Sequence, residues 1–153
     1  MALKDGPPAS SGGEVGVKVA VVGSRNFKYL DLVKDYIDSL PDKTVVVTGG
    51  ARGVDAAAED AARKRGLEVV VVTPDYSSYG HIATKVRNSV IARMADKVTA
   101  FWDGLSGGTA NTLAWAAVWG RPVEVFMKRR WRNTLHSTWG PTDARGVGST
   151  KGG

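Results

Sequence analysis

Cysteine is absent from the 153 residues of this chain, and histidine occurs only twice, at His81 and His136. Without cysteine the chain forms neither a disulfide nor a thiolate metal site, and this composition fits a reducing compartment. Two histidines so widely separated in the sequence are too few for a metal centre with acidic partners. We therefore expect no bound metal ion, and we expect a cytoplasmic protein.

Long hydrophobic runs are also missing. An uncharged stretch at residues 105–120 is too short and too rich in glycine to span a bilayer, which takes roughly 20 apolar residues. Residues 1–16 lack the apolar core of a signal peptide, and their Gly, Pro and Ser content is typical of a disordered leader. We expect no membrane partner.

A large charge of one sign is missing from most of the chain, although the formal net charge is +6. Residues 1–126 contain 15 Lys and Arg against 14 Asp and Glu, whereas residues 127–153 contain six against one. The basic character therefore belongs to the C-terminal segment, and a nearly neutral domain precedes it. Residues 128–153 show no periodic pattern, so we predict a basic, disordered tail that offers a contact for nucleic acid.

Apolar runs and amphipathic segments alternate along the rest of the chain. Strands are predicted at residues 17–23, 44–48, 68–73, 97–102 and 122–126. Helices are predicted at residues 30–40, 53–66, 82–95 and 108–119. This alternation predicts one α/β domain over residues 17–127, a Rossmann-like three-layer fold with a mostly parallel five-stranded sheet.

Polar, loop-forming residues follow each of the first four predicted strands, whereas the opposite strand ends lead into ordinary turns. Ligands of open α/β sheets bind beyond the carboxyl ends of the strands, so one functional rim is expected there. Two of these loops contain Ser or Thr followed by two glycines, at residues 48–50 and 106–108, before an alanine-rich helix. Such a loop suits a phosphate, and the alternative is a plain tight turn. Neither loop is a P-loop, because no Gly-Lys-[Ser/Thr] follows.

Four side chains at this rim have two interpretations each. Arg25 could grip a phosphate or form a surface ion pair. Arg87 could be a second anion ligand and Asn88 a base or ribose contact, or both could lie on a solvated helix face. Asp55 could accept ribose hydroxyls or cap the following helix.

Aromatic and acidic residues complete the candidate site. Trp102, Tyr76 and Tyr79 could stack on a base, with core packing as the alternative for Trp102. Asp103 and Asp75 could act as acid and base, although spacing alone does not show it. The candidate ligand-binding residues are Gly23, Ser24, Arg25, Gly49, Gly50, Arg52, Gly53, Asp55, Arg87, Asn88, Asp103, Ser106, Gly107, Gly108, Thr109 and Asn111.

Four motifs in order, GSRNF, TGGARGVDAAAEDAA, RNSVIARMADKVTAFWDG and SGGTANTLAWAAVWGRPV, resemble the SLOG superfamily over residues 17–126. The chain is most similar to the small stand-alone branch found in bacteria and phages. The superfamily includes the DNA-processing protein A fold, which binds single-stranded DNA, the lonely-guy phosphoribohydrolases, and sensor domains for nucleotide-derived signals. The resemblance implies a Rossmann-like sheet with a ligand site at its carboxyl rim.

One departure from the phosphoribohydrolases bears on activity. Their PGGxGTxxE motif supplies a catalytic glutamate, whereas residues 106–112 read SGGTANT with no glutamate in the next turn. Asp103 is the one candidate substitute for that carboxylate. Three functions stay open: binding of a nucleotide or nucleotide-derived ligand, N-glycosidic hydrolysis of a nucleoside monophosphate, and binding of single-stranded nucleic acid. No cofactor beyond such a ligand is implied, and a homodimer or higher oligomer is common in such folds.

Overall fold

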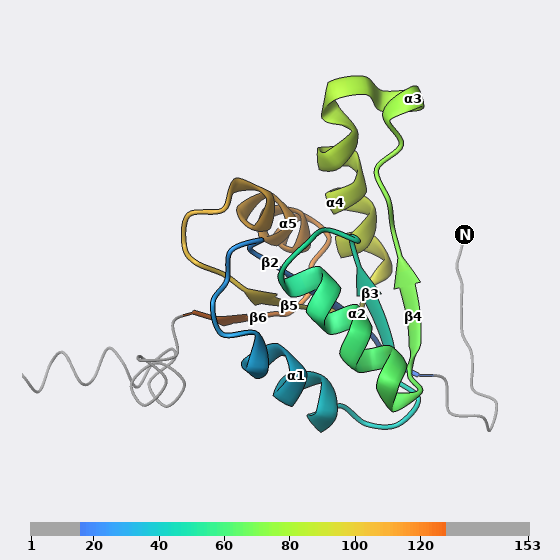
Figure 1. Cartoon of the computed structure of the whole chain (residues 1–153). Helices are drawn as coiled ribbons and strands as arrows, with labels where there is room; N and C mark the ends of the chain where they lie inside the picture. Colours follow the sequence, from blue (N-terminus) through green and yellow to red (C-terminus); the bar gives the residue numbers. More distant parts are fainter. Residues whose placement is uncertain (1–15, 128–153) are drawn as a thin grey trace, which may run out of the picture.

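The computed structural model describes residues 16–127 of the chain (Figure 1). The predicted basic tail at residues 128–153 and all but the last residue of the predicted leader lie outside the described residues.

Five parallel strands form one sheet in the order β4-β3-β2-β5-β6. The strands are β2 (Lys18–Gly23), β3 (Val45–Thr48), β4 (Glu68–Val71), β5 (Lys97–Phe101) and β6 (Val123–Phe126). The register brings Gly23 beside Phe101 and Phe101 beside Phe126, so the carboxyl ends of these strands meet at one rim. The predicted parallel α/β fold is confirmed, with strands up to two residues shorter than their apolar runs.

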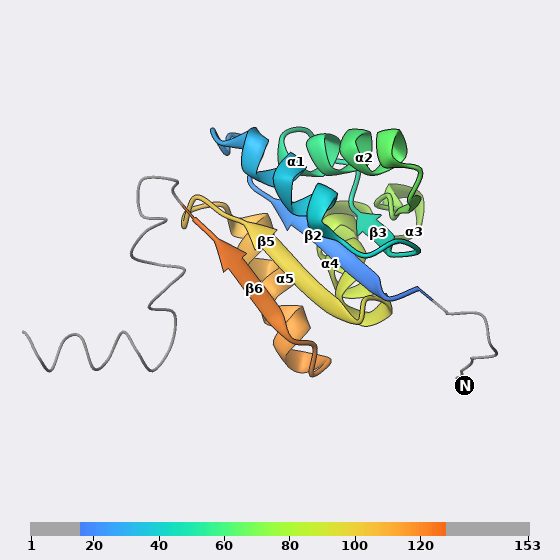
Figure 2. The same cartoon turned by 90° about the horizontal axis from the view of Figure 1, so that it is seen from below.

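Helices cover both faces of the sheet (Figures 1 and 2). The helices α1 (Leu30–Ser39) and α2 (Val54–Arg65) pack on one face, and α4 (Ala83–Met94) and α5 (Gly107–Val118) pack on the other. None of the helices within residues 16–127 is long and apolar enough to cross a membrane.

Successive side chains of the central strand β2 point to opposite faces of the sheet, so this strand contributes to both halves of the core. Val19 and Val21 of β2 face α1 and α2, and Ala20 and Val22 face α4 and α5. Each fully buried valine contributes about 1.5–3 kcal/mol relative to an exposed one. The core therefore fixes the strand ends, and with them the positions of the loops at the rim.

The segment between β4 and α4 departs from the expected irregular loop. It forms a short helix, α3 (Tyr76–Tyr79), and a 3₁₀ turn, η1 (Gly80–Ile82). Asp75 is the N-cap of α3, because its carboxylate accepts hydrogen bonds from Ser78 N at 3.1 Å and Ser77 Oγ at 2.9 Å.

Candidate functional site

A cavity of about 450 Å³ opens at the carboxyl rim of the sheet. Ten of the sixteen candidate residues line it: Gly23, Ser24, Arg25, Asp55, Arg87, Asn88, Asp103, Ser106, Gly108 and Thr109. The cavity therefore joins the ends of β2 and β5 to α4 and the start of α5. Its volume falls within the range of roughly 300–1,000 Å³ that is typical of small-molecule sites.

The glycines at this rim fall into two groups according to the space around them. A Cβ atom at Gly53 would overlap the backbone of Arg25, and one at Gly49 would lie 2.7 Å from Arg87 Nη1. By contrast, a Cβ atom at Gly107 or Gly108 would meet no atom within 4 Å among the described residues. The first group is required by the packing of the protein itself, whereas the backbone at the start of α5 is open to a ligand.

Asp55, in the first turn of α2, holds the loop that follows β3. Its side chain is 4% exposed, and its Oδ2 accepts hydrogen bonds from Gly49 N at 2.9 Å and Ala51 N at 3.4 Å. Burial raises the pKa of Asp55 to about 6, although the two N–H groups and the nearby Arg87 charge act in the opposite direction. The carboxylate thus stabilises the glycine loop, which neither sequence interpretation of Asp55 included.

Arg87 and Asn88 face inward from α4, so the solvated-face interpretation is wrong for Asn88, which is 6% exposed. Arg87 Nη1 donates to Gly49 O, and Arg87 Nε donates to Asn88 Oδ1 at 2.9 Å. Asn88 Nδ2 in turn donates to Asn111 Oδ1 at 3.0 Å and approaches Gly108 O at 3.5 Å. Arg87 therefore contacts the glycine loop after β3, Asn88 contacts the start of α5, and both side chains line the cavity.

Asp103 shapes the loop between β5 and α5. Its Oδ1 accepts hydrogen bonds from Leu105 N and Ser106 N, both at 2.8 Å. These N–H groups lower the pKa of Asp103 below its usual value, with the Leu105 bond as the largest cause. Trp102 Nε1 donates to Ser106 O at 3.0 Å and closes the same turn. The geometry matches loop capping for Asp103 and a structural role for Trp102.

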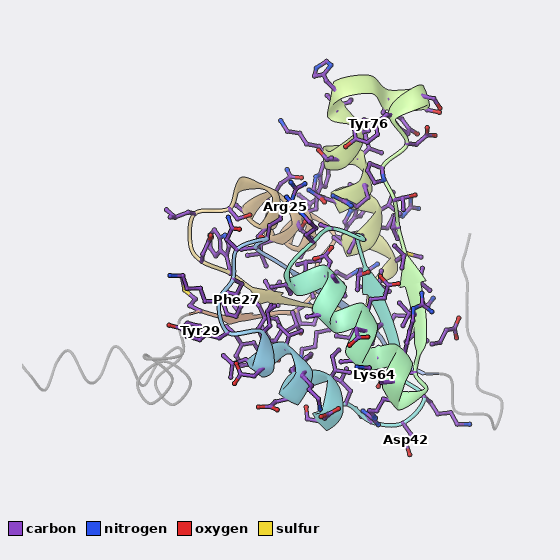
Figure 3. The ribbon with its side chains drawn as sticks, viewed as in Figure 1. Arg25, Phe27, Tyr29, Asp42, Lys64 and Tyr76 are labelled. Carbon is purple, nitrogen blue, oxygen red and sulfur yellow. The ribbon has the colours of Figure 1, made fainter. Side chains whose placement is uncertain are left out.

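Arg25 leaves the end of β2 as an exposed side chain at the cavity (Figure 3). None of the ion pairs formed within residues 16–127 involves its guanidinium. The surface ion pair that sequence offered as an alternative is therefore not formed there. Arg25 and the N-terminal turn of α5 give this cavity a cationic side chain and open backbone N–H groups.

Several candidates lie away from the cavity lining. Tyr76 and Tyr79 belong to α3 and are 60% and 48% exposed, and Figure 3 shows Tyr76 well apart from Arg25. Neither tyrosine lines the cavity, so the structure gives no support to base stacking there. The other candidates outside the lining are Gly49, Gly50, Arg52, Gly53, Asp75, Trp102, Gly107 and Asn111.

The cavity also includes residues that sequence reasoning did not select. These are Val22, Asn26, Ala51, Thr84, Ile91, Leu105 and Thr112. Helical spacing from the candidate Asn88 could have identified Thr84 and Ile91, because these three residues lie on one face of α4. Leu105 is 87% exposed and gives no sequence signal that separates it from an ordinary loop residue.

Comparison with protein families gives one match within this domain. Residues 17–79 match the model of the YspA, cpYpsA-related SLOG family. No curated protein sequence matches the chain significantly.

Solved structures share the fold over most of the chain. DNA processing protein A from Streptococcus pneumoniae superposes with a TM-score of 0.63 at 25% identity, covering 72% of this chain and 50% of that protein. The chain thus spans half the length of the pneumococcal protein. DNA processing protein A from Helicobacter pylori, whose structure describes its single-stranded DNA binding mode, gives a TM-score of 0.59 at 19% identity and covers 75% and 67%.

A third structure, that of TM1055, superposes with a TM-score of 0.53 at 26% identity and covers 70% of this chain and 72% of that one. The match over residues 17–79 and the fold shared with these structures support the resemblance of the ordered motifs to the SLOG superfamily.

Proposed function

We propose that this domain binds a nucleotide or a nucleotide-derived phosphate ligand in the rim cavity. The observation that carries the proposal is the open backbone of Gly108 in a cavity that Arg25 also lines. A phosphate at the start of α5 would accept hydrogen bonds from the N-terminal N–H groups and lie in the favourable field of the helix dipole. Arg25 would add a charge-assisted hydrogen bond.

The remaining lining suits the rest of such a ligand. Ser24, Asn26 and Thr84 offer hydroxyl and amide groups, while Val22 and Ile91 offer apolar surface. This mixture of a few polar groups with apolar walls is typical of small-molecule sites. The cavity volume of about 450 Å³ is compatible with a mononucleotide, which supports a single small ligand.

Binding is favoured over N-glycosidic hydrolysis by the placement of the acidic residues around the cavity. Asp55 and Asp103 are the acidic side chains that line the cavity. Both accept hydrogen bonds from loop N–H groups, and the first turn of α5 contains no acidic residue. These bonds reach one oxygen of each carboxylate, so hydrolysis is disfavoured by α5, whose first turn has no acidic residue where the resembling phosphoribohydrolases carry their glutamate.

The test combines a ligand panel with a turnover assay. Thermal unfolding with the common nucleoside monophosphates should reveal a stabilising ligand, since a ligand at 100 times its Kd adds about 2.7 kcal/mol. Chromatography of the same mixtures should show no free base at rates of roughly 1–10³ per second. Release of base at such rates would replace the proposal with a phosphoribohydrolase activity.

Single-stranded nucleic acid is the second candidate, because the superfamily resemblance includes a DNA-binding branch and Arg25 and Arg52 are both exposed at the rim. A short oligothymidylate in the same panel separates the two. Tighter binding of the oligonucleotide than of any mononucleotide, with a steep salt dependence, would favour this second function.

A further inference from the structure

A continuous set of hydrogen bonds connects the two glycine loops across α4. We call residues 49–53 the first glycine loop and residues 104–108 the second glycine loop. Asp55 and Arg87 hold the first loop through Gly49, whose N–H donates to the carboxylate and whose carbonyl accepts from the guanidinium. Arg87 then bonds Asn88, whose amide reaches Asn111 of α5 and Gly108 O.

The middle of this set is buried and satisfied. Asn88 accepts at Oδ1 from Arg87 and donates from Nδ2 toward α5, so both ends of its amide are used. Asp55 and Asn88 are 4% and 6% exposed, so both side chains are largely buried although they line the cavity. Buried polar networks of this kind have discrete arrangements, because a partly broken network leaves unpaired polar groups in a low dielectric.

The first loop fits closely between its two holders. A Cβ atom at Gly49 would lie 2.7 Å from Arg87 Nη1 and 3.0 Å from Asp55 Oδ2. The guanidinium therefore contacts the loop backbone directly, and it cannot move toward a ligand without releasing Gly49 or Asn88. This position differs from that of Arg25, whose guanidinium has no ion pair within the described part of the chain.

We propose that Arg87 and Asn88 are positioning residues that couple the two glycine loops, so that displacement of either loop is transmitted to the other. The coupling deepens the proposed function, since a phosphate bound at the second loop would also order the first. It is nevertheless a property of the ligand-free protein. Reciprocal coupling between two sites requires that a change at either end is felt equally at the other.

Amide hydrogen exchange of the ligand-free full chain, followed residue by residue by NMR, tests the coupling at both ends. Asn111→Ala removes an acceptor on α5, and the amides of Gly49 and Ala51 report on the first loop. Asp55→Asn changes the first loop, and the amide of Ala110, which donates to Ser106 O, reports on the second. Lys85→Ala, at an exposed position of α4, is the control variant. Exchange of β5 amides in each variant corrects for global stability.

Each end change should accelerate exchange at the far loop by about fivefold or more, and Lys85→Ala should leave both loops unchanged. In an Arg87→Ala background the effect of Asn111→Ala on Gly49 and Ala51 should disappear, because the connection is cut. If Arg87→Ala does not fold, Asn88→Ala provides the same cut.

Acceleration confined to the mutated loop would overturn the proposal. An effect of Asn111→Ala on the first loop that stays equally large in the Arg87→Ala or Asn88→Ala background would also overturn it, because the coupling would then not pass through Arg87 and Asn88. No nucleotide is present in this experiment, so a failure of the coupling leaves the ligand proposal standing. Conversely, coupled loops in a protein that binds no nucleotide would contradict the proposed function alone.

Discussion

Asp55 and Arg87 hold the same residue, Gly49, the carboxylate through the N–H group and the guanidinium through the carbonyl. Two side chains from different helices thus hold the two peptide groups on either side of Gly49 at the rim of the sheet. The first glycine loop is shaped by the protein, and the open start of α5 is left for a ligand.

Gly49→Ala should lower the free energy of unfolding by about 1–3 kcal/mol, because its methyl group would press on Arg87 and Asp55. Gly107→Ala is the matched control, since a Cβ atom there meets no described atom within 4 Å and alanine favours a helix. Urea unfolding of both variants measures the difference. Equal effects of the two substitutions would show that the space around Gly49 does not decide its identity.

Arg25→Ala should weaken binding of a nucleoside monophosphate by about 1.5–3 kcal/mol, which is a tenfold loss of affinity or more. The free energy of unfolding should change by less than about 0.5 kcal/mol, because the side chain is exposed and forms no described ion pair. Arg52→Ala, exposed but outside the cavity lining, serves as the control in calorimetric titrations. Equal losses for the two variants would mean that only general positive charge matters.

The stability of the domain should depend on pH through Asp55. Its pKa is about 6 in the fold against 3.8 ordinarily, so the folded chain keeps this proton to a higher pH than the unfolded chain. The contribution of Asp55 to the free energy of unfolding is therefore largest below pH 3.8 and is lost as the pH rises through 6.

When the pH is lowered from 7 to 5, the free energy of unfolding of the unmutated protein should rise by about 1 kcal/mol relative to that of Asp55→Asn, because asparagine does not titrate. Urea unfolding of both proteins at the two pH values measures the gain, and other carboxylates cancel in the difference. If the free energies of unfolding of the two proteins differed by the same amount at pH 5 and pH 7, Asp55 would not titrate in this range.

Thr48→Val should raise the free energy of unfolding by about 1–3 kcal/mol. The Thr48 hydroxyl at the end of β3 is buried and has no hydrogen-bond partner within residues 16–127, so its removal costs no bond. Thr99→Val is the control, because Thr99 is equally buried but bonds Tyr36 OH at 2.8 Å. Thermal or urea unfolding should show opposite signs for the two variants. Destabilisation by both would mean that Thr48 has a partner in solution.

The fold followed from sequence because its signals are local. The continuous apolar run Val19, Ala20, Val21 and Val22 specifies a strand buried on both faces, and Gly66 ends α2 in the left-handed conformation that glycine favours. The rim loops were also predictable, since parallel strands bring their carboxyl ends together wherever the sheet forms.

The roles of individual rim residues were not predictable in the same way. Arg87 had two interpretations from sequence, an anion ligand or a side chain on a solvated helix face. Its bond to Gly49 O joins residues 38 positions apart and depends on how α4 sits over the sheet, so sequence alone did not indicate it. The distinction between Gly49 and Gly108 likewise depends on which neighbours occupy the space beside each glycine. A single sequence gives the residue types at the rim but not the distances between their side chains.

The central claim is that the cavity recognises phosphate, and calorimetric titration of adenosine 5′-monophosphate against adenosine, repeated for the other three bases, tests it most directly. At least one nucleotide should bind tenfold or more tightly than its own nucleoside, since the phosphate gains one or more charge-assisted hydrogen bonds of about 1.5–3 kcal/mol. Gly108→Ala, which adds a methyl group to the open backbone at the start of α5, should reduce that difference and leave the fold intact. Equal affinities for nucleotide and nucleoside across all four bases would contradict the account.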